Sequence, residues 1–151
     1  MIVKETTNTG EIKTVLCSPA IYPCISDDNS PEPDSFEPPI SEEYQYIAGY
    51  VDSDIIGIMI YHSEEGRTNI HIQVLPEYRK EYAREFGRMA LKFGEAKNVI
   101  IYAEIPECYP NVLEFAKSFG FKETGESIKN DCTKDGVKYD AIILRLNQWG
   151  L

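Results

Sequence analysis

Basic side chains are scarce in the first half of this sequence. No lysine or arginine occurs between Lys13 and Arg67, so residues 1–66 carry 2 basic and 13 acidic side chains, a net charge of −11. Residues 67–151 carry 13 basic and 12 acidic side chains, a net charge of +1. Phosphate backbones and anionic lipid surfaces repel a chain whose overall charge is −10. The composition therefore argues against nucleic acid or a membrane as the main partner.

Metal-binding and cross-linking residues are also few. The four cysteines, at positions 17, 24, 108 and 132, form no C-x-x-C pair, and only His62 and His71 could join them in a metal site. A zinc site is therefore not expected. A chain of this size with 42% apolar residues does not need a disulfide framework. This favours reduced thiols in a cytosol-like compartment.

Long apolar runs and targeting signals are missing as well. No run approaches the roughly 20 apolar residues that a membrane helix needs. The residues from Met1 to Glu5 do not follow a secretory signal pattern. We therefore expect a cytoplasmic protein. The length of 151 residues predicts one domain, residues 1–151, large enough to bury a hydrophobic core.

What the sequence does contain is a regular alternation of strand and helix patterns. Strands are expected at residues 2–6, 46–51, 55–61, 69–75, 99–105, 121–127 and 139–146, and helices at 9–17, 77–94 and 110–119. The almost continuous apolar run at 99–105 is typical of a buried parallel strand. Gly94 is expected to end the second helix, and Trp149 to cover an edge of the core. The order predicts an α/β fold with a mixed sheet.

A long acidic segment, residues 27–43, interrupts this pattern. It contains Pro31, Pro33, Pro38 and Pro39, and a structureless loop of this length is uncommon in a compact domain. Two interpretations stay open. The segment is either a lid over a site or a solvated, partly disordered excursion.

The junction from Val74 to Arg84 carries the strongest chemical signal. A strand ends, Pro76 breaks it, and a helix begins at once. The first backbone N–H groups of a helix have no internal acceptor and lie in positive potential, so a pyrophosphate fits there. Lys80, Arg84, Arg88 and Lys92 follow as a row spaced by four residues. The competing interpretation is an ordinary solvated helix face.

This junction resembles the cofactor segment of the GNAT family of N-acetyltransferases. That segment is roughly Val-x-Pro-x-x-Arg-x-x-Gly-x-Gly/Ala, and Val74, Pro76 and Arg79 match it in place. Tyr82 and Arg84 stand where the two small residues of the family lie. Glycine in these positions lets the backbone approach the pyrophosphate.

The resemblance continues downstream, over about residues 44–146. Members often contain a Glu-Val pair at the end of a strand and a Gly-Phe pair after the next helix. Glu104-Ile105 and Gly120-Phe121 match these pairs. Tyr109 stands at the usual Asn position, and Ala116 at the position of a Tyr that often acts as general acid. The pattern is similar to short GNAT-like proteins encoded in phage genomes.

The resemblance implies a GNAT-like fold, in which a mostly antiparallel sheet flanked by helices contains one splayed pair of parallel strands. It also implies transfer of an acetyl group from acetyl-CoA, as cosubstrate, to an amine. The strands at 69–75 and 99–105 would form the splayed pair. Backbone groups of Val74 and Leu75 would bind the pantetheine. Arg79 and the amides of Lys80, Glu81, Tyr82, Ala83 and Arg84 would hold the pyrophosphate.

Direct attack of an amine on a thioester needs a base and an acid. Glu104 is the first candidate base, because it matches a family glutamate and because an apolar strand raises a carboxyl pKa. It is otherwise a solvated strand end. His71 is the second candidate, or else a packed histidine. Tyr109 or Tyr102 could protonate the leaving thiolate, unless water does so.

Three functions stay open from the sequence. The first is the N-acetyltransferase, acting on a small amine, a protein lysine, a protein N-terminus or an antibiotic. The second is a catalytically degenerate GNAT-fold binding or interaction protein, consistent with Tyr82, Arg84 and Ala116. The third is a small acidic decoy. A homodimer is also possible. If the acidic half lines the acceptor side, it could attract a cationic amine.

Overall fold

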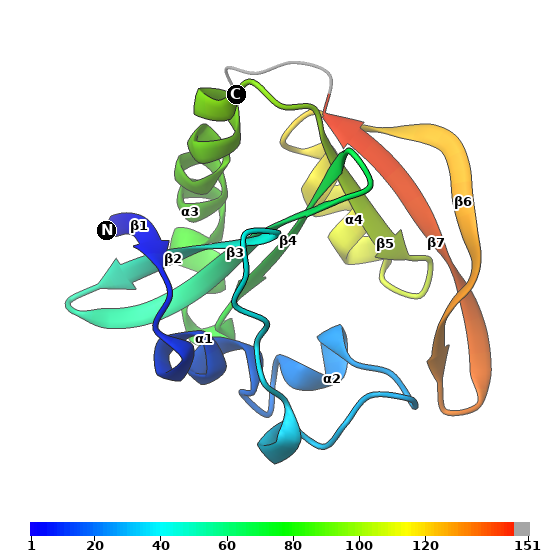
Figure 1. Cartoon of the computed structure of the whole chain (residues 1–151), viewed down its shortest axis with the longest axis horizontal. Coiled ribbons are helices and arrows are strands. Elements are labelled where there is room, and N and C mark those ends of the chain that lie inside the picture. Colours follow the sequence, from blue (N-terminus) through cyan, green and yellow to red (C-terminus); the bar gives the residue numbers. More distant parts are fainter. Residues whose placement is uncertain (147–151) are drawn as a thin grey trace.

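The computed structural model describes residues 1–146, so the position expected for Trp149 lies outside the described residues. Within that range, seven strands form one sheet in the order β1-β2-β3-β4-β5-β7-β6 (Figure 1). The elements are β1 (Ile2–Thr6), α1 (Thr9–Leu16), α2 (Tyr22–Ile25), the short 3-10 helix η1 (Pro33–Ser35), β2 (Tyr44–Val51), β3 (Asp54–Glu64), β4 (Arg67–Val74), α3 (Pro76–Lys97), β5 (Ile101–Pro106), α4 (Pro110–Lys117), β6 (Phe121–Lys134) and β7 (Val137–Leu146).

The sheet is mixed and mostly antiparallel. Among the described strands, β4 and β5 form the single parallel pair, and all other neighbours run antiparallel. The β4–β5 pairing covers only Thr68 with Ile101 and Asn69 with Tyr102. Beyond these residues the two strands no longer pair. The predicted fold class, with its splayed parallel pair, is therefore confirmed.

One face of the sheet, which we call the α3 face, holds the larger hydrophobic core. Alternate strand residues such as Met59, Ile70 and Ile101 pack there against α3 and α4. Phe86 of α3 is fully buried at its centre. A Cβ at Gly49 would lie 2.7 Å from the Phe86 ring, and one at Gly57 would lie 2.9 Å from a backbone oxygen of β4. The glycines therefore let the aromatic ring approach the strand backbone closely.

Helix α3 continues past the predicted stop at Gly94, and that prediction was wrong. The hydroxyl of Tyr61, from β3, donates to the carbonyl of Ala90 at 2.9 Å and accepts the N–H of Gly94 at 3.1 Å. It thus bonds both partners of one i→i−4 step of the helix, so glycine here serves a buried contact. The helix ends at Asn98, whose left-handed φ of 52° forms the C-cap.

The opposite face, which we call the α1 face, is only partly covered. Helix α1 begins at the N-cap Asn8, whose side chain accepts the Glu11 N–H at 3.1 Å. Its apolar residues pack over β2 and β3 in a second, smaller core of Ile12, Val15, Leu16, Tyr46, Ala48 and Ile58. The part of the α1 face formed by β4 and β5 carries polar side chains such as Asn69, His71, Tyr102 and Glu104 instead.

The start of the acidic segment 27–43 is held against the tip of the β6–β7 hairpin (Figure 1). Asp28 accepts the N–H groups of Asp135 at 2.9 Å and Gly136 at 2.8 Å. Its own N–H donates to the carbonyl of Thr133 at 2.8 Å, and Asp27 accepts the Thr133 N–H at 3.0 Å. We call these contacts the clasp. They hold the first two residues of the segment, Asp27 and Asp28, against the hairpin.

The clasp also explains why the hairpin is longer than expected. Strand β6 runs to Lys134 instead of stopping at residue 127, and β7 begins at Val137. The turn at Asp135 and Gly136 was predicted correctly, and both residues have positive φ. Among residues 1–146, no helix is long and apolar enough to cross a membrane.

Candidate functional site

The candidate site lies on the α1 face, where the strands register four polar side chains side by side. His62 of β3 pairs with Asn69 of β4, Asn69 with Tyr102 of β5, and Tyr102 with Arg145 of β7. We call these four residues the polar row. Since neighbouring residues on a strand point to opposite faces, the core residues Ile70, Ile101 and Leu144 point the other way.

Stacking contacts order two members of this row, His62 and Tyr102. The rings of Tyr44 and His62 stack with their centroids 4.1 Å apart and an interplanar angle of 7°. The guanidinium carbon of Arg67 lies 3.9 Å from the centre of the Tyr102 ring. This distance is that of a cation–π contact. The row is therefore a layer of aromatic and cationic groups at the place where β4 and β5 still pair.

Two buried polar atoms in the row are left without a partner. Neither Oδ1 of Asn69 nor Nε of Arg145 has a hydrogen-bond partner among residues 1–146. Asn69 is only 8% exposed. Burying an unpaired polar atom costs free energy, so such atoms are rare and mark a strained or functional place.

Glu104 lies two residues beyond Tyr102 on β5, past the last residue that pairs with β4. The alternation of the strand places its side chain on the same face as Tyr102. Burial raises the pKa of the Glu104 carboxyl, the charge of Asp131 raises it further, and Arg67 opposes this effect. A raised pKa brings a carboxylate closer to the range useful for a general base.

His71 lies at the corresponding level of β4, two residues beyond Asn69. The imidazole is exposed to solvent, yet burial among the surrounding protein lowers its pKa, and His62 adds to this effect. The lowered pKa favours the neutral imidazole, the form that accepts a proton.

The two tyrosines considered as general acids have different positions. Tyr102 belongs to the polar row beneath Arg67. Tyr109 is the N-cap residue of α4 and packs partly against the larger core. The Nζ of Lys134 lies 5.9 Å from the centre of its ring. Tyr109 is therefore placed near Lys134, at the end of β6 beside the tip of the β6–β7 hairpin, whereas Tyr102 shares a strand face with Glu104.

The junction between β4 and α3 differs from the expected pyrophosphate site. The helix begins at Pro76, so the amides from Lys80 to Arg84 lie within a continuous helix. Amides in that position donate to carbonyls four residues earlier and are not free for a ligand. The expectation that they bind a pyrophosphate is contradicted for this reason.

The earlier backbone donors of the junction are also occupied. The N–H of Leu75 donates to the carbonyl of Ile56 at 2.8 Å, and the N–H of Tyr78 donates to that of Leu75 at 2.9 Å. Pro76 has no N–H. The Leu75 N–H therefore cannot bind pantetheine as expected. Because directions alternate along a strand, the N–H of Val74 points away from β3, toward the side of β5.

The side chains at the junction complete this picture. The Nε of Arg79 donates to the carbonyl oxygen of Val74 at 2.8 Å. Tyr82 is half-buried, with its ring 6.2 Å from that of Tyr78. The guanidinium carbon of Arg84 lies 5.9 Å from the ring centre of Phe119. The residues present therefore fit a pantetheine arm at Val74 but do not fit a diphosphate at the start of α3.

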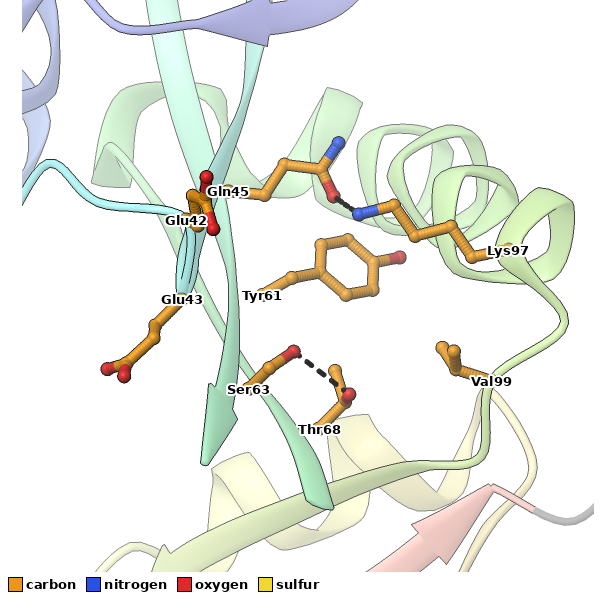
Figure 2. A pocket seen from close by; sticks show the side chains of 8 residues that line it. All are labelled: Glu42, Glu43, Gln45, Tyr61, Ser63, Thr68, Lys97 and Val99. Atoms are coloured by element: carbon orange, nitrogen blue, oxygen red, sulfur yellow. Dashed lines mark hydrogen bonds between the residues drawn. The ribbon is translucent and has the colours of Figure 1, made fainter. Parts of the chain in front are cut away.

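A small surface hollow of about 60 Å³ lies on the other face of the sheet (Figure 2). Glu42, Glu43, Gln45, Tyr61, Ser63, Thr68, Lys97 and Val99 line it. The Nζ of Lys97 donates to the side-chain oxygen of Gln45, and the hydroxyls of Ser63 and Thr68 lie 3.2 Å apart. Its volume is close to that of one or two water molecules. It is too small for a substrate and lies away from Glu104.

The sequence analysis missed four residues of this region: His62, Arg67, Asn69 and Arg145. Extending the alternation of Ile58 and Ile60 by two residues would have placed His62 on the α1 face. The pairing of Asn69 with Tyr102 depends on the register of two strands that a helix separates, and no local signal predicts it. Among residues 1–146, no group of three His, Cys, Asp or Glu side chains is arranged to hold a metal ion.

Comparisons with known proteins identify the fold of this chain. No protein-family model matches the chain, and no curated protein matches it significantly. Solved structures do match. The ribosomal-protein-S18-alanine N-acetyltransferase of Escherichia coli is 16% identical, with a TM-score of 0.71 over 99% of this chain and 96% of that one. The ribosomal-protein-alanine N-acetyltransferase of Brucella melitensis is 13% identical, with a TM-score of 0.72 over 96% and 98%.

A third structure carries the family name. A Desulfovibrio desulfuricans protein assigned to the GNAT family is 16% identical, with a TM-score of 0.70 over 96% of this chain and 97% of that one. Such low identities together with nearly complete coverage describe a shared architecture. The chain therefore has the fold of the GNAT acetyltransferases.

Proposed function

We propose that the protein is an N-acetyltransferase that moves an acetyl group from acetyl-CoA to an amine by direct attack. One observation carries the proposal. In a GNAT fold, a half-buried glutamate with a raised pKa, Glu104, stands where the β4–β5 pairing stops. The fold of the solved neighbours supports acyl transfer as the reaction class.

The proposed chemistry assigns one step to each group. Glu104 removes a proton from the ammonium form of the acceptor, and the amine nitrogen then attacks the thioester carbonyl carbon. The C–N bond forms and the C–S bond breaks. The second proton of the amine nitrogen leaves as the amide forms, and Tyr102, Tyr109 or water passes a proton on to the leaving thiolate. His71 is the alternative base. The Val74 N–H would donate to the pantetheine arm.

The acceptor is proposed to be a cationic amine, either a small molecule or a protein amine. The carboxylates of Asp131 and Glu64 both act on Glu104 and so contribute negative potential at the base. Arg67 reduces that potential and stacks on Tyr102. The acids near the base therefore come from the β6 strand and the β3–β4 hairpin. The carboxylates of Asp27 and Asp28 are occupied in the clasp.

The substitution Glu104→Gln tests the assignment of the base. We expect kcat to fall by about 10²–10⁴-fold, because the amide keeps the shape but cannot accept the proton. The wild-type rate should also fall as the pH drops through the raised pKa of Glu104, at a pH above the ordinary glutamate value of about 4.3. Rates across a pH series for an amine panel would check both effects. An unchanged rate in the variant contradicts the role of Glu104.

A stability measurement separates this loss from unfolding. The pKa of Glu104 is higher in the folded protein than in the unfolded chain. The stability that this group contributes is therefore fully present at a pH below its pKa in the unfolded chain, and is lost as the pH rises through its pKa in the folded protein. Glu104→Gln should therefore be at least as stable as the wild type at neutral pH. Glu107→Gln, at an exposed position just after β5, is the matched control and should keep full activity.

A second function is favoured by the β4–α3 junction. We infer a GNAT-fold binding protein without catalysis as the alternative, because the expected amides are inside the helix and Ala116 replaces the family tyrosine. Acetyl-CoA that binds without turnover over the amine panel would support this alternative. Turnover with any amine contradicts it. The cytoplasmic location, the phage origin and the homodimer stay predictions.

A further inference from the structure

The β4–α3 junction bears on the acyl donor, and the inference here rests on the proposed function. A diphosphate bound at a helix start needs several free N–H groups that converge on it. At this junction the N–H groups of Leu75 and Tyr78 already donate to backbone carbonyls, and Pro76 has no N–H group. Among the donors of the first turn, this leaves the N–H of Glu77. The carboxylate of that same residue lies in the first turn, where it competes with an anion for the positive potential.

The side chains of Tyr82 and Arg84, near the start of α3, lead to the same conclusion. Tyr82 and Arg84 occupy the two positions where a small residue would let a ligand reach the backbone. Their side chains continue a regular helix whose buried side begins at Phe86. Converting this region to a free loop would cost the hydrogen bonds of the first turns of α3.

On the β5 side of the junction one backbone donor of β4 has no partner on β3. The N–H of Val74 points toward the β5 side, beyond the last β4–β5 pair. Arg79 reaches the same edge, because its Nε donates to the Val74 carbonyl at 2.8 Å. The junction therefore offers one backbone donor on the β5 side, which could bind an amide carbonyl of a pantetheine arm. Beyond Arg79, the nucleotide half of coenzyme A finds only the N–H of Glu77 among the backbone groups of the first turn.

We propose that the protein recognises its acyl donor through the pantetheine thioester arm and makes no specific contacts with the diphosphate–nucleotide half of coenzyme A. Coenzyme A and its shortened analogues are then equivalent ligands. The donor class is an acylated pantetheine, whatever group is attached to its far end.

Isothermal titration with three probes tests this selection: coenzyme A, pantetheine, and adenosine 3′,5′-bisphosphate. We expect coenzyme A and pantetheine to bind with Kd values within about threefold, a difference of less than 1 kcal/mol. The bisphosphate should give no saturable heat. Transfer rates from acetyl-CoA and S-acetyl-pantetheine should differ equally little.

The possible failures are distinguishable. Coenzyme A that binds more than about thirtyfold tighter than pantetheine overturns the inference and leaves the proposed acetyltransferase intact. Saturable binding of the bisphosphate also overturns the inference and leaves the proposed acetyltransferase intact. No binding of coenzyme A or pantetheine overturns the proposed function together with the inference.

A gain-of-binding variant tests the physical cause. The double substitution Tyr82→Gly and Arg84→Gly should loosen the start of α3 and raise the affinity for coenzyme A over pantetheine by about tenfold or more. The double substitution Glu85→Gly and Arg88→Gly lowers helix propensity equally at exposed positions farther along α3, and is the matched control. An unchanged affinity ratio in the first variant contradicts the role given to Tyr82 and Arg84.

Discussion

The two faces of the sheet use the same strands for different purposes. On the α3 face, residues such as Ile70 and Ala103 pack under α3 and α4 in a continuous apolar core. Their immediate neighbours Asn69, Tyr102 and Glu104 lie on the α1 face and place polar groups over β4 and β5. The difference follows from the two-residue period of a strand.

This division separates stability from chemistry. The α3 face is filled by two helices, so burial stabilises it. On the α1 face, α1 packs mainly in the small core over β2 and β3, away from the place where the β4–β5 pairing stops. A substitution on one face should therefore affect the free energy of unfolding, and its neighbour on the other face should affect binding or catalysis.

The largest expected effect lies on the α3 face, at Phe86. This side chain is fully buried, and its ring packs against Gly49 and Gly57. Phe86→Ala should lower the free energy of unfolding by about 3–5 kcal/mol, since it removes a large apolar group and leaves a cavity. Urea denaturation followed by circular dichroism would measure the loss. A loss below about 1 kcal/mol would mean that the α3 face is not the main core.

A smaller effect is expected at the clasp, where hydrogen bonds replace burial. Asp28→Ala removes the acceptor of the Asp135 and Gly136 N–H groups. These two amides should then exchange with solvent faster, with little change in the exchange of the α3 core. Hydrogen exchange followed by NMR would check this, with the exposed neighbour Asn29→Ala as the control. Equal protection in the variant would show that the clasp does not hold the hairpin tip.

Acid should loosen the same contacts in the wild type. Backbone hydrogen bonds from Thr133 and Asn29 lower the pKa of the Asp27 carboxyl. A lowered folded pKa contributes stability that is present above the unfolded value and is lost as the pH falls through the folded one. The exchange protection of the Thr133 amide should therefore decline below the ordinary aspartate value of about 3.9. Asp27→Asn should remove this pH dependence.

The smallest effect on stability is expected at His71, next to the buried Ile70. The imidazole is exposed on the α1 face, so His71→Ala should change the free energy of unfolding by no more than about 0.5 kcal/mol. Thermal denaturation at neutral pH would measure it. Any effect of the substitution should instead be found in acetyl transfer, where His71 is the alternative base. A loss comparable to that of Phe86→Ala would remove the distinction between the two faces.

Local patterns predicted most of the elements and singled out one candidate site residue, Glu104. The alternation from Asn69 to Val74 indicated a strand, the apolar run near Ala103 indicated a buried one, and both strands are present. Glu104 was singled out because it stands in that run at a position matching a family glutamate. Each of these inferences uses residues close together in the chain, where periodicity alone carries the information.

The sequence by itself thus determined the order of strands and helices, their buried sides and the α/β class. Only the tertiary structure decided that Tyr61 bonds within α3, that Asp28 reaches the hairpin tip, and that His62, Asn69, Tyr102 and Arg145 lie in one row. The helix start near residue 77 was predicted from the sequence, whereas the structure showed that the Leu75 and Tyr78 N–H groups donate to the carbonyls of Ile56 and Leu75. The reason is physical: periodicity records which side of an element is buried. The partner across a strand, and the carbonyl that takes each N–H, depend on residues distant in the chain.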